Sequence, residues 1–373
     1  MVIVILFGFG ILLSQFYIFP SGLPQPAHFL IATSFVYTLV TKKRVLTFKK
    51  SEWQVKVIYL FILYSLLVNL TFASINSDFE FILSSAYIAF GVAVFLQIKK
   101  IIVDISENSL SISRFAFIGL MVLFVLAVLG LGDYKFFPRY NAFFNDPNQM
   151  AFWTLCIAAV LLVSKELPRY FKALVFVAAL FIILKSASRS GLVGFAFLFF
   201  GYLTSQFIEN RDKFGVKTIA IGICSLIFSL TTAYYIFFIN ADVFEFLMSR
   251  MDIVNVSDQA DIRGYTRILE FPEYLLFGAG QGNDERFNPE GTEIHSTPAG
   301  ILFYYGLIGL SIFTIFLYSI LKKLKIHEKI IFLAPLMYSF STLGFRTPIF
   351  WFYLGIFYVL ALNNTSLRRM QRR

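Results

Sequence analysis

The residues of this sequence that could do chemistry are arginines and one histidine. Four arginines and His295, one of only three histidines, lie in residues 240–298, the longest polar stretch of the chain. The guanidinium group is planar, permanently charged and shaped to bind phosphate oxygens in pairs. An imidazole titrates near neutral pH and can take a proton from a sugar hydroxyl. This combination favours an anionic, phosphate-bearing substrate and general-base catalysis.

Further arginines occur in other turns between apolar runs. Arg189 is the most informative, because the turn 185–191 is so short that its side chain must stay near the ends of two runs. A lone arginine can equally be an interfacial anchor, and a lone histidine is more often structural or on the surface. The candidate catalytic residues are Arg189, Arg267 and His295, and the candidate substrate-binding residues are Arg139, Asn148, Arg263, Arg286 and Arg346.

Composition determines the fold class. The chain is 58% hydrophobic and 14% charged, whereas soluble domains have about 25% charged residues. It consists of repeated apolar runs of roughly 15–24 residues, the length that crosses a bilayer core as a helix. The runs are continuous rather than alternating, which argues against a β-barrel. We therefore predict an all-α polytopic membrane protein.

About twelve transmembrane helices are expected in a single domain, residues 1–373. They are 2–19, 27–40, 57–72, a fourth ending near 96, 115–131, a sixth ending near 163, 173–184, 192–208, 218–239, 299–321, 330–343 and 349–362. Residues 99–114 have mixed composition and are predicted to lie along the membrane surface. One large loop, 240–298, separates the ninth and tenth helices.

The distribution of basic residues predicts the topology. Loops on the side of both termini hold 23 of the 32 lysines and arginines, and the opposite side holds nine. By the positive-inside rule, both termini are cytoplasmic and the large loop faces the periplasm. The net charge of +10 then reflects topology and implies no nucleic-acid partner.

No metal or cofactor is expected. Cys156 and Cys224 both lie within apolar runs, and no His, Cys, Asp and Glu set has metal-ligand spacing. The glycine cluster 278–282 resembles a phosphate-cradling loop, but it follows no βαβ pattern. A tight turn is the favoured interpretation.

Several of these stretches together resemble the O-antigen polymerase (Wzy) and O-antigen ligase (WaaL) superfamily. These are integral membrane glycosyltransferases that use sugars carried on undecaprenyl diphosphate. The likeness covers predicted helices five to ten. It is carried by residues 145–148 (Asn-Asp-Pro-Asn), 188–191 (Ser-Arg-Ser-Gly), 267–282, His295 and 304–309 (Tyr-Tyr-Gly-Leu-Ile-Gly). Arg267 and Gly278, with ten residues between them, look like the arginine-to-glycine spacing of the polymerases.

The resemblance implies a GT-C-type glycosyltransferase of the bacterial inner membrane, acting at the periplasmic face without metal or nucleotide sugar. The family's membrane-edge arginine corresponds to Arg189, its loop arginine to Arg263 or Arg267, and its histidine to His295. The implied reaction transfers a growing glycan from undecaprenyl diphosphate to a lipid-linked repeat unit. The expected partners are this donor and acceptor, the lipid bilayer and a chain-length regulator membrane protein.

Two alternatives remain beside the polymerase. An O-antigen ligase transfers the glycan to lipid A–core and uses the same donor and similar residues. A lipid-linked sugar flippase or transporter belongs to another class. Transporters usually place charges or broken helices at mid-membrane, whereas nearly all ionisable residues here fall at predicted helix ends. The polymerase is the favoured hypothesis.

Overall fold

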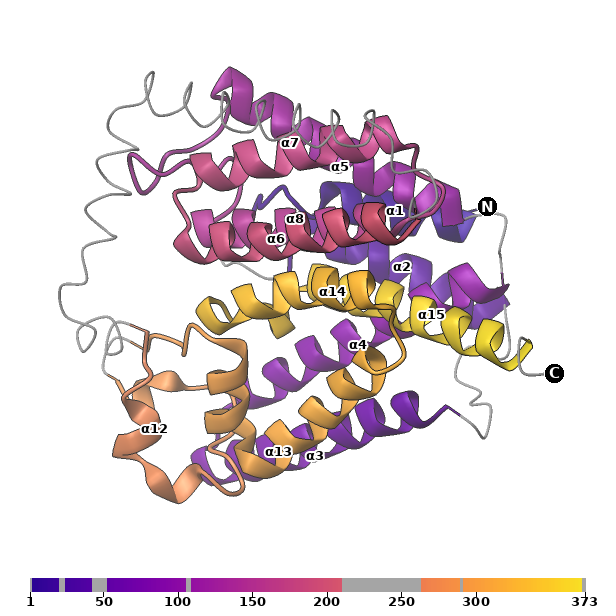
Figure 1. Cartoon of the computed structure of the whole chain (residues 1–373). Coiled ribbons are helices and arrows are strands. Elements are labelled where there is room, and N and C mark those ends of the chain that lie inside the picture. Colours follow the sequence, from indigo (N-terminus) through magenta and orange to yellow (C-terminus); the bar gives the residue numbers. More distant parts are fainter. Residues whose placement is uncertain are drawn as a thin grey trace. The chain divides into compact units, whose positions relative to one another are not determined.

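The computed structural model describes residues 2–19, 24–41, 52–104, 109–209, 263–288 and 291–370. Within them the fold is helical and contains no strand (Figure 1). The long helices are α1 (Val2–Leu13), α2 (Pro26–Thr41), α3 (Trp53–Asn76), α4 (Glu80–Asp104), α5 (Ser109–Leu129), α6 (Pro147–Val163), α7 (Arg169–Lys185), α8 (Arg189–Glu209), α13 (Thr297–Leu321), α14 (Ile326–Tyr338) and α15 (Pro348–Met370). The short ones are α12 (Arg267–Glu270), η3 (Pro272–Tyr274), η4 (Asp284–Arg286), η5 (Ser339–Ser341) and η6 (Gly344–Arg346).

Six of the described helices are long and apolar enough to cross a bilayer, in agreement with the predicted membrane-protein class. They are α3, α4, α5, α8, α13 and α15. Helices α1, α2 and α6 are apolar but shorter. Each predicted run inside the described residues coincides with a helix. The ninth, 218–239, and the first part of the large loop, 240–262, lie outside them.

Several predicted boundaries are wrong; among them, the predicted helices 330–343 and 349–362 are α14 at Ile326–Tyr338 and α15 at Pro348–Met370. The first helix ends at Leu13 rather than near Phe19. The backbone amides of Ile18 and Phe19 instead donate hydrogen bonds to Gln25 Oε1 at 2.7 and 2.9 Å, which holds these residues outside the helix. Residues 99–104 continue α4 and residues 109–114 begin α5. The described residues of the predicted surface segment therefore belong to the ends of two long helices, α4 and α5.

The chain divides into two compact units, each assembled from three stretches. Unit 1 comprises residues 1–41, 98–252 and 324–338, and unit 2 comprises residues 42–97, 253–323 and 339–373. Three of the five boundaries lie in polar segments, after residues 41, 252 and 323, but one falls inside α4, and both units are built from the same kind of apolar helix.

In unit 1, two glycines allow close packing of α8 on α14. A Cβ at Gly194 would lie 3.2 Å from the carbonyl oxygen of Ala334, and one at Gly201 would lie 3.0 Å from the amide nitrogen of Ile331. The two glycines are seven residues apart and therefore share one helix face. Small residues of this kind let membrane helices approach closely. This contact positions the start of α8, where Arg189 lies.

In unit 2, α13 is interrupted at Gly306, whose φ of 65° and ψ of −175° are not helical. Residues 275–280 pair with the interruption. The Leu307 amide donates to the Leu275 carbonyl at 2.7 Å, and the Ala279 amide donates to the Phe303 carbonyl at 2.9 Å. Backbone groups left unpaired inside a membrane helix are costly, so these bonds attach the loop before α13 firmly to the helix.

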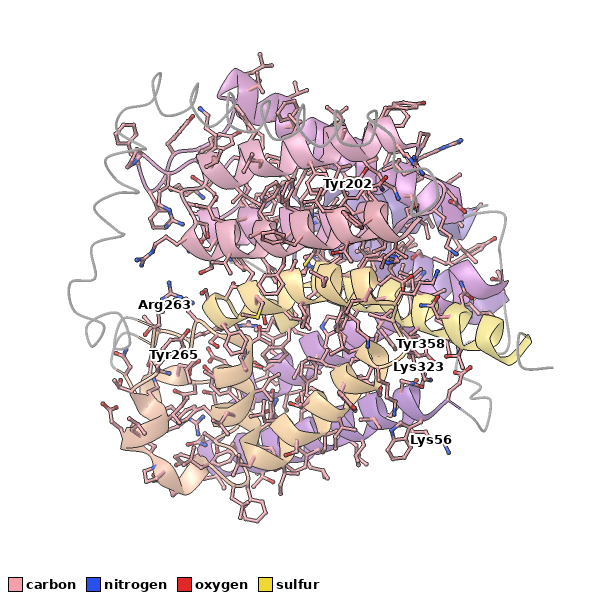
Figure 2. All side chains as sticks on the ribbon, in the orientation of Figure 1. Lys56, Tyr202, Arg263, Tyr265, Lys323 and Tyr358 are labelled. Atoms are coloured by element: carbon pink, nitrogen blue, oxygen red, sulfur yellow. The ribbon has the colours of Figure 1, made fainter. Side chains whose placement is uncertain are left out.

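Unit 2 also separates Arg263, in the loop before α13, from Lys56 and Lys323. Figure 2 shows Arg263 and Tyr265 at one end of this helical bundle and Lys56 and Lys323 at the other. The predicted topology requires this arrangement, since it assigns the polar loop 240–298 and the loops that contain Lys56 and Lys323 to opposite sides of the membrane.

Candidate functional site

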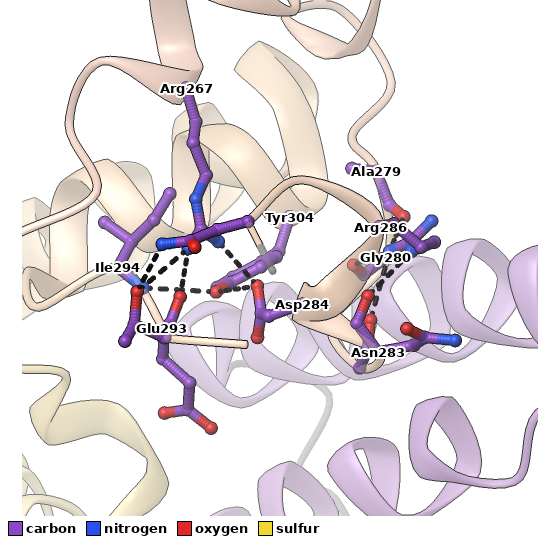
Figure 3. Close-up of polar contacts among 12 residues, drawn as sticks. Arg267, Ala279, Gly280, Asn283, Asp284, Arg286, Glu293, Ile294 and Tyr304 are labelled. Carbon is purple, nitrogen blue, oxygen red and sulfur yellow. Dashed lines mark hydrogen bonds and ion pairs between the residues drawn. The ribbon is translucent and has the colours of Figure 1, made fainter. Parts of the chain in front are cut away.

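A buried ion pair fixes Arg267 inside the loop before α13 (Figure 3). Its Nη1 lies 2.9 Å from Asp284 Oδ1, and its Nη2 donates to the Thr292 carbonyl. The Tyr304 hydroxyl on α13 donates to the same Asp284 oxygen at 2.8 Å. The Arg267 and Asp284 side chains are only 3% and 7% exposed. Buried charges require such partners, so this cluster forms the framework of the loop.

The Arg286 side chain is enclosed by the glycine turn 278–282 and bonds to its backbone. Its N–H groups donate at 3.0–3.3 Å to four backbone carbonyls, those of Ala279, Gly280, Gly282 and Asn283. Its guanidinium also lies 4.6–5.3 Å from the centroids of three rings, those of Phe72, Phe81 and Phe287. These contacts are cation–π in geometry. The glycine cluster 278–282 is therefore a tight turn around the Arg286 side chain rather than a phosphate-binding loop.

The short segment 292–295, which leads into α13, collects contacts from the surrounding loop. In chain order these are Thr292 with Arg267, Glu293 with Arg346, Ile294 with Tyr304, and His295 with Arg263. The last is a backbone bond of 3.1 Å from the His295 amide to the Arg263 carbonyl. His295 is exposed. The segment therefore gathers four of the sequence-predicted residues at the start of one helix.

Arg346 has fewer hydrogen-bond partners than Arg267 and Arg286. Its Nη1 is paired with Glu293, and its guanidinium lies 5.5 Å from the centroid of the Tyr87 ring. Its Nε is buried and has no hydrogen-bond acceptor. The Arg346 side chain is 21% exposed and that of Glu293 is 38% exposed. The Arg346 side chain is therefore more exposed than that of Arg267, which is 3% exposed.

Unit 1 brings together the remaining candidates. Arg139 donates from Nε to the Ser186 carbonyl at 2.9 Å and from Nη2 to Asn148 Oδ1 at 2.8 Å. The Tyr338 hydroxyl donates to the Asn148 carbonyl at 2.9 Å and lies 3.0 Å from the Ser188 hydroxyl. Arg189, the next residue, begins α8 and is partly buried.

The candidate residues therefore form two clusters. Arg139, Asn148 and Arg189 belong to unit 1, and Arg263, Arg267, Arg286, His295 and Arg346 belong to unit 2. No model of a known protein family matches this chain, and no curated protein matches it either. Within the described residues, no group of three His, Cys, Asp or Glu side chains could hold a metal ion.

Burial dominates the electrostatics of the unit 2 cluster. It raises the pKa of the Asp284 carboxyl, although the Tyr304 hydroxyl and the Arg267 guanidinium oppose this shift. It also lowers the pKa of the Arg286 and Arg346 guanidinium groups. Arginine remains charged at neutral pH even so. Charges in such a poorly hydrated region interact strongly with any anion that enters it.

The partners of these arginines were missed by sequence reasoning. Asp284 and Glu293 are among the fifteen acidic residues of the side that is predicted to face outward, and nothing in their local sequence distinguishes them. The rule that a buried arginine needs an acidic partner could have indicated that such residues exist. It could not have selected them, because they lie 17 and 53 residues from Arg267 and Arg346.

Proposed function

We propose that this protein is a metal-independent glycosyltransferase that polymerises lipid-linked glycans, as its resemblance to the O-antigen polymerases implies. The observation that carries the proposal is the gathering of Arg263, Arg267, His295 and Arg346 around residues 292–295. These residues precede α13, a helix long and apolar enough to cross a bilayer. Cationic groups at the end of such a helix suit a substrate whose diphosphate lies at the membrane surface.

In the proposed reaction, a hydroxyl of the acceptor repeat unit attacks the anomeric carbon of the donor glycan. The new carbon–oxygen bond forms as the bond to the lipid diphosphate breaks, and the hydroxyl proton passes to His295. Guanidinium groups stabilise the negative charge that develops on the departing diphosphate. Direct displacement inverts the configuration at the anomeric carbon.

The contacts divide the unit 2 arginines between two roles. Arg267 and Arg286 are surrounded by protein acceptors, so we assign them to positioning of the loop. Arg346 and the partly buried Arg263 are assigned to the substrate diphosphate. In unit 1, Arg189 is a second anion-binding candidate, supported by its place at the first turn of α8 beside the Arg139–Asn148 pair.

The interruption of α13 bears on the transporter alternative. Broken membrane helices often expose backbone groups that bind a transported substrate. Here the Leu307 and Ile308 amides and the Phe303 and Tyr304 carbonyls are paired with residues 275–280. The break therefore attaches a loop and leaves these groups no role with a substrate, which favours an enzyme over a transporter.

The test offers two acceptors to the purified full-length protein in lipid vesicles. Undecaprenyl-diphosphate-linked repeat units serve as donor, and either the same molecules or lipid A–core serve as acceptor. We expect glycans of several repeat units on undecaprenyl diphosphate, resolved as a ladder on gels. Products only on lipid A–core would identify a ligase instead, and no product with either acceptor would exclude both transferases.

A further inference from the structure

The backbone of residues 275–280 is paired with protein groups of unit 2. Three successive carbonyls, those of residues 275–277, accept hydrogen bonds of 2.7–3.5 Å from the Leu307 amide, the Ile308 amide and the Tyr64 hydroxyl. The carbonyls of residues 279 and 280 accept from Arg286. The amides of residues 278–280 donate at 2.8–2.9 Å to other backbone carbonyls. Irregular backbone can lie at membrane depth only where it is packed against protein in this way.

The exposed side chains of the same segment are apolar. Leu276 is 50% exposed and Phe277 is 61% exposed. They adjoin Leu307 of α13, which is 51% exposed, and α3, whose Tyr64 bonds to the Phe277 carbonyl at 2.8 Å. The exposed leucines of α3 on either side of Tyr64 are Leu60, Leu63 and Leu67. The segment therefore extends an apolar surface that belongs to two helices long and apolar enough to cross a bilayer.

The lysines at the other end of these two helices give the depth of the segment. Lys56 and Lys322 are exposed, and a lysine ammonium must reach water or the lipid headgroups. Tyr64 lies eight residues after Lys56, and Leu307 lies fifteen residues before Lys322. At about 1.5 Å per residue, these separations are about 12 Å and about 22 Å along the helices. Both are shorter than the bilayer core of about 30 Å, so the two contacts fall inside the core.

We propose that residues 275–280 are a re-entrant segment, whose Leu276 and Phe277 side chains lie among the hydrocarbon chains of the membrane lipids. The exposed Glu273, three residues before Leu276, marks the point from which the chain enters the bilayer. The predicted loop 240–298 is then divided, with one part inside the membrane and the charged parts outside it. The backbone bonds to α13 and α3 hold the segment there.

The re-entrant segment also sets the level of the candidate site. The Tyr304 hydroxyl, which bonds to Asp284 of the buried pair with Arg267, is carried two residues before Gly306. Tyr304 lies eighteen residues before Lys322, or about 27 Å along α13, which is close to the boundary of the core. The buried pair is therefore held at the membrane surface. This inference does not rest on the proposed function, since it uses only the contacts of unit 2 and the spanning length of its helices.

The experiment places nitroxide spin labels on the full-length protein in lipid vesicles. The labelled variants are Leu276→Cys, Phe277→Cys, Leu63→Cys and Glu285→Cys, each in a Cys156→Ala, Cys224→Ser background. Oxygen concentrates in hydrocarbon and a nickel chelate concentrates in water, so the ratio of their collision rates reports which one surrounds the label. Leu63→Cys is the lipid reference on α3, and Glu285→Cys is the water reference, because both native residues are exposed. We expect Leu276→Cys and Phe277→Cys to give the ratio of Leu63→Cys.

Ratios as low as that of Glu285→Cys would place the segment in water and overturn the proposal. Low collision rates with both reagents would show that protein, such as a second copy of the chain, covers the surface, and would overturn it as well. A second test compares Phe277→Asp with Leu269→Asp, since Leu269 is 81% exposed beside the exposed Glu270. A charge in hydrocarbon is costly, so only Phe277→Asp should lower the unfolding midpoint. Equal midpoints would contradict the proposal.

Discussion

At the residue scale, the structure distinguishes arginines that build the loop from arginines that remain accessible. Arg267 and Asp284 are a buried pair completed by the Tyr304 hydroxyl, and Arg286 is closed in by carbonyls and rings. The sequence indicated a catalytic role for Arg267 and a substrate-binding role for Arg286, but it did not show that both are enclosed by protein partners. Burial and partner geometry make the distinction, and neither is encoded in local sequence.

Asp284→Asn should strongly destabilise the protein. Removing one partner of a buried ion pair leaves the other charge uncompensated and costs about 3–5 kcal/mol. Tyr304→Phe removes one hydroxyl from the same cluster and should cost about 1 kcal/mol. The midpoint of thermal unfolding in detergent measures both. Tyr318→Phe on α13, where the side chain is 62% exposed, is the control, and an Asp284→Asn midpoint equal to that control would contradict the assignment.

His295→Ala should reduce the rate of glycan transfer by roughly 10²–10⁴, the usual contribution of a general base. Because His295 is exposed, the substitution should leave the unfolding midpoint unchanged and the KM for the lipid-linked donor nearly so. Single-turnover rates with purified protein measure the effect. Full activity of the variant would remove the base role while leaving the anion-binding proposal intact.

At the element scale, the apolar runs located the helices but not the interruption of α13. Residues 299–321 form one uninterrupted apolar run in the sequence. Because glycine is common in membrane helices, Gly306 did not indicate an interruption of the helix. The segment that completes the break, 275–280, lies well outside the run. A pairing between two distant stretches is a tertiary property, which hydrophobic periodicity does not report.

Gly306→Ala should disrupt unit 2 more than Gly130→Ala disrupts the turn after α5. Both glycines have positive φ, 65° and 66°, and the ψ of −175° at Gly306 places it in a region that is essentially restricted to glycine. A Cβ at Gly306 would also overlap the Leu276 carbonyl oxygen, whereas the nearest atom to one at Gly130 is 4.0 Å away. We expect a distinctly lower unfolding midpoint for Gly306→Ala. Equal midpoints would show that residues 275–280 are not packed against the break.

At the scale of the whole molecule, composition alone was sufficient to predict an all-helical membrane protein. The described part contains six helices of membrane-spanning length. The division into two units was not predictable, because the chain passes between them within α4 and between consecutive helices. The clusters of candidate residues follow this division, with Arg189 in one unit and His295 in the other.

The predicted topology can be tested by labelling introduced cysteines in a Cys156→Ala, Cys224→Ser background. Glu285→Cys lies in the arginine loop and Lys322→Cys follows α13, and both native residues are exposed. A membrane-impermeant maleimide added to spheroplasts should label Glu285→Cys at once and Lys322→Cys only after the membrane is permeabilised. The reverse pattern would invert the topology and place the arginine loop in the cytoplasm.

Deleting the gene from its source organism tests the central claim most directly. If the protein polymerises lipid-linked repeat units, cells without it should carry surface glycans of a single repeat unit. The wild-type gene should then restore long chains, and an Arg189→Ala or His295→Ala variant should not. Long chains that persist in the deletion strain, or a surface with no repeat unit attached at all, would contradict the account.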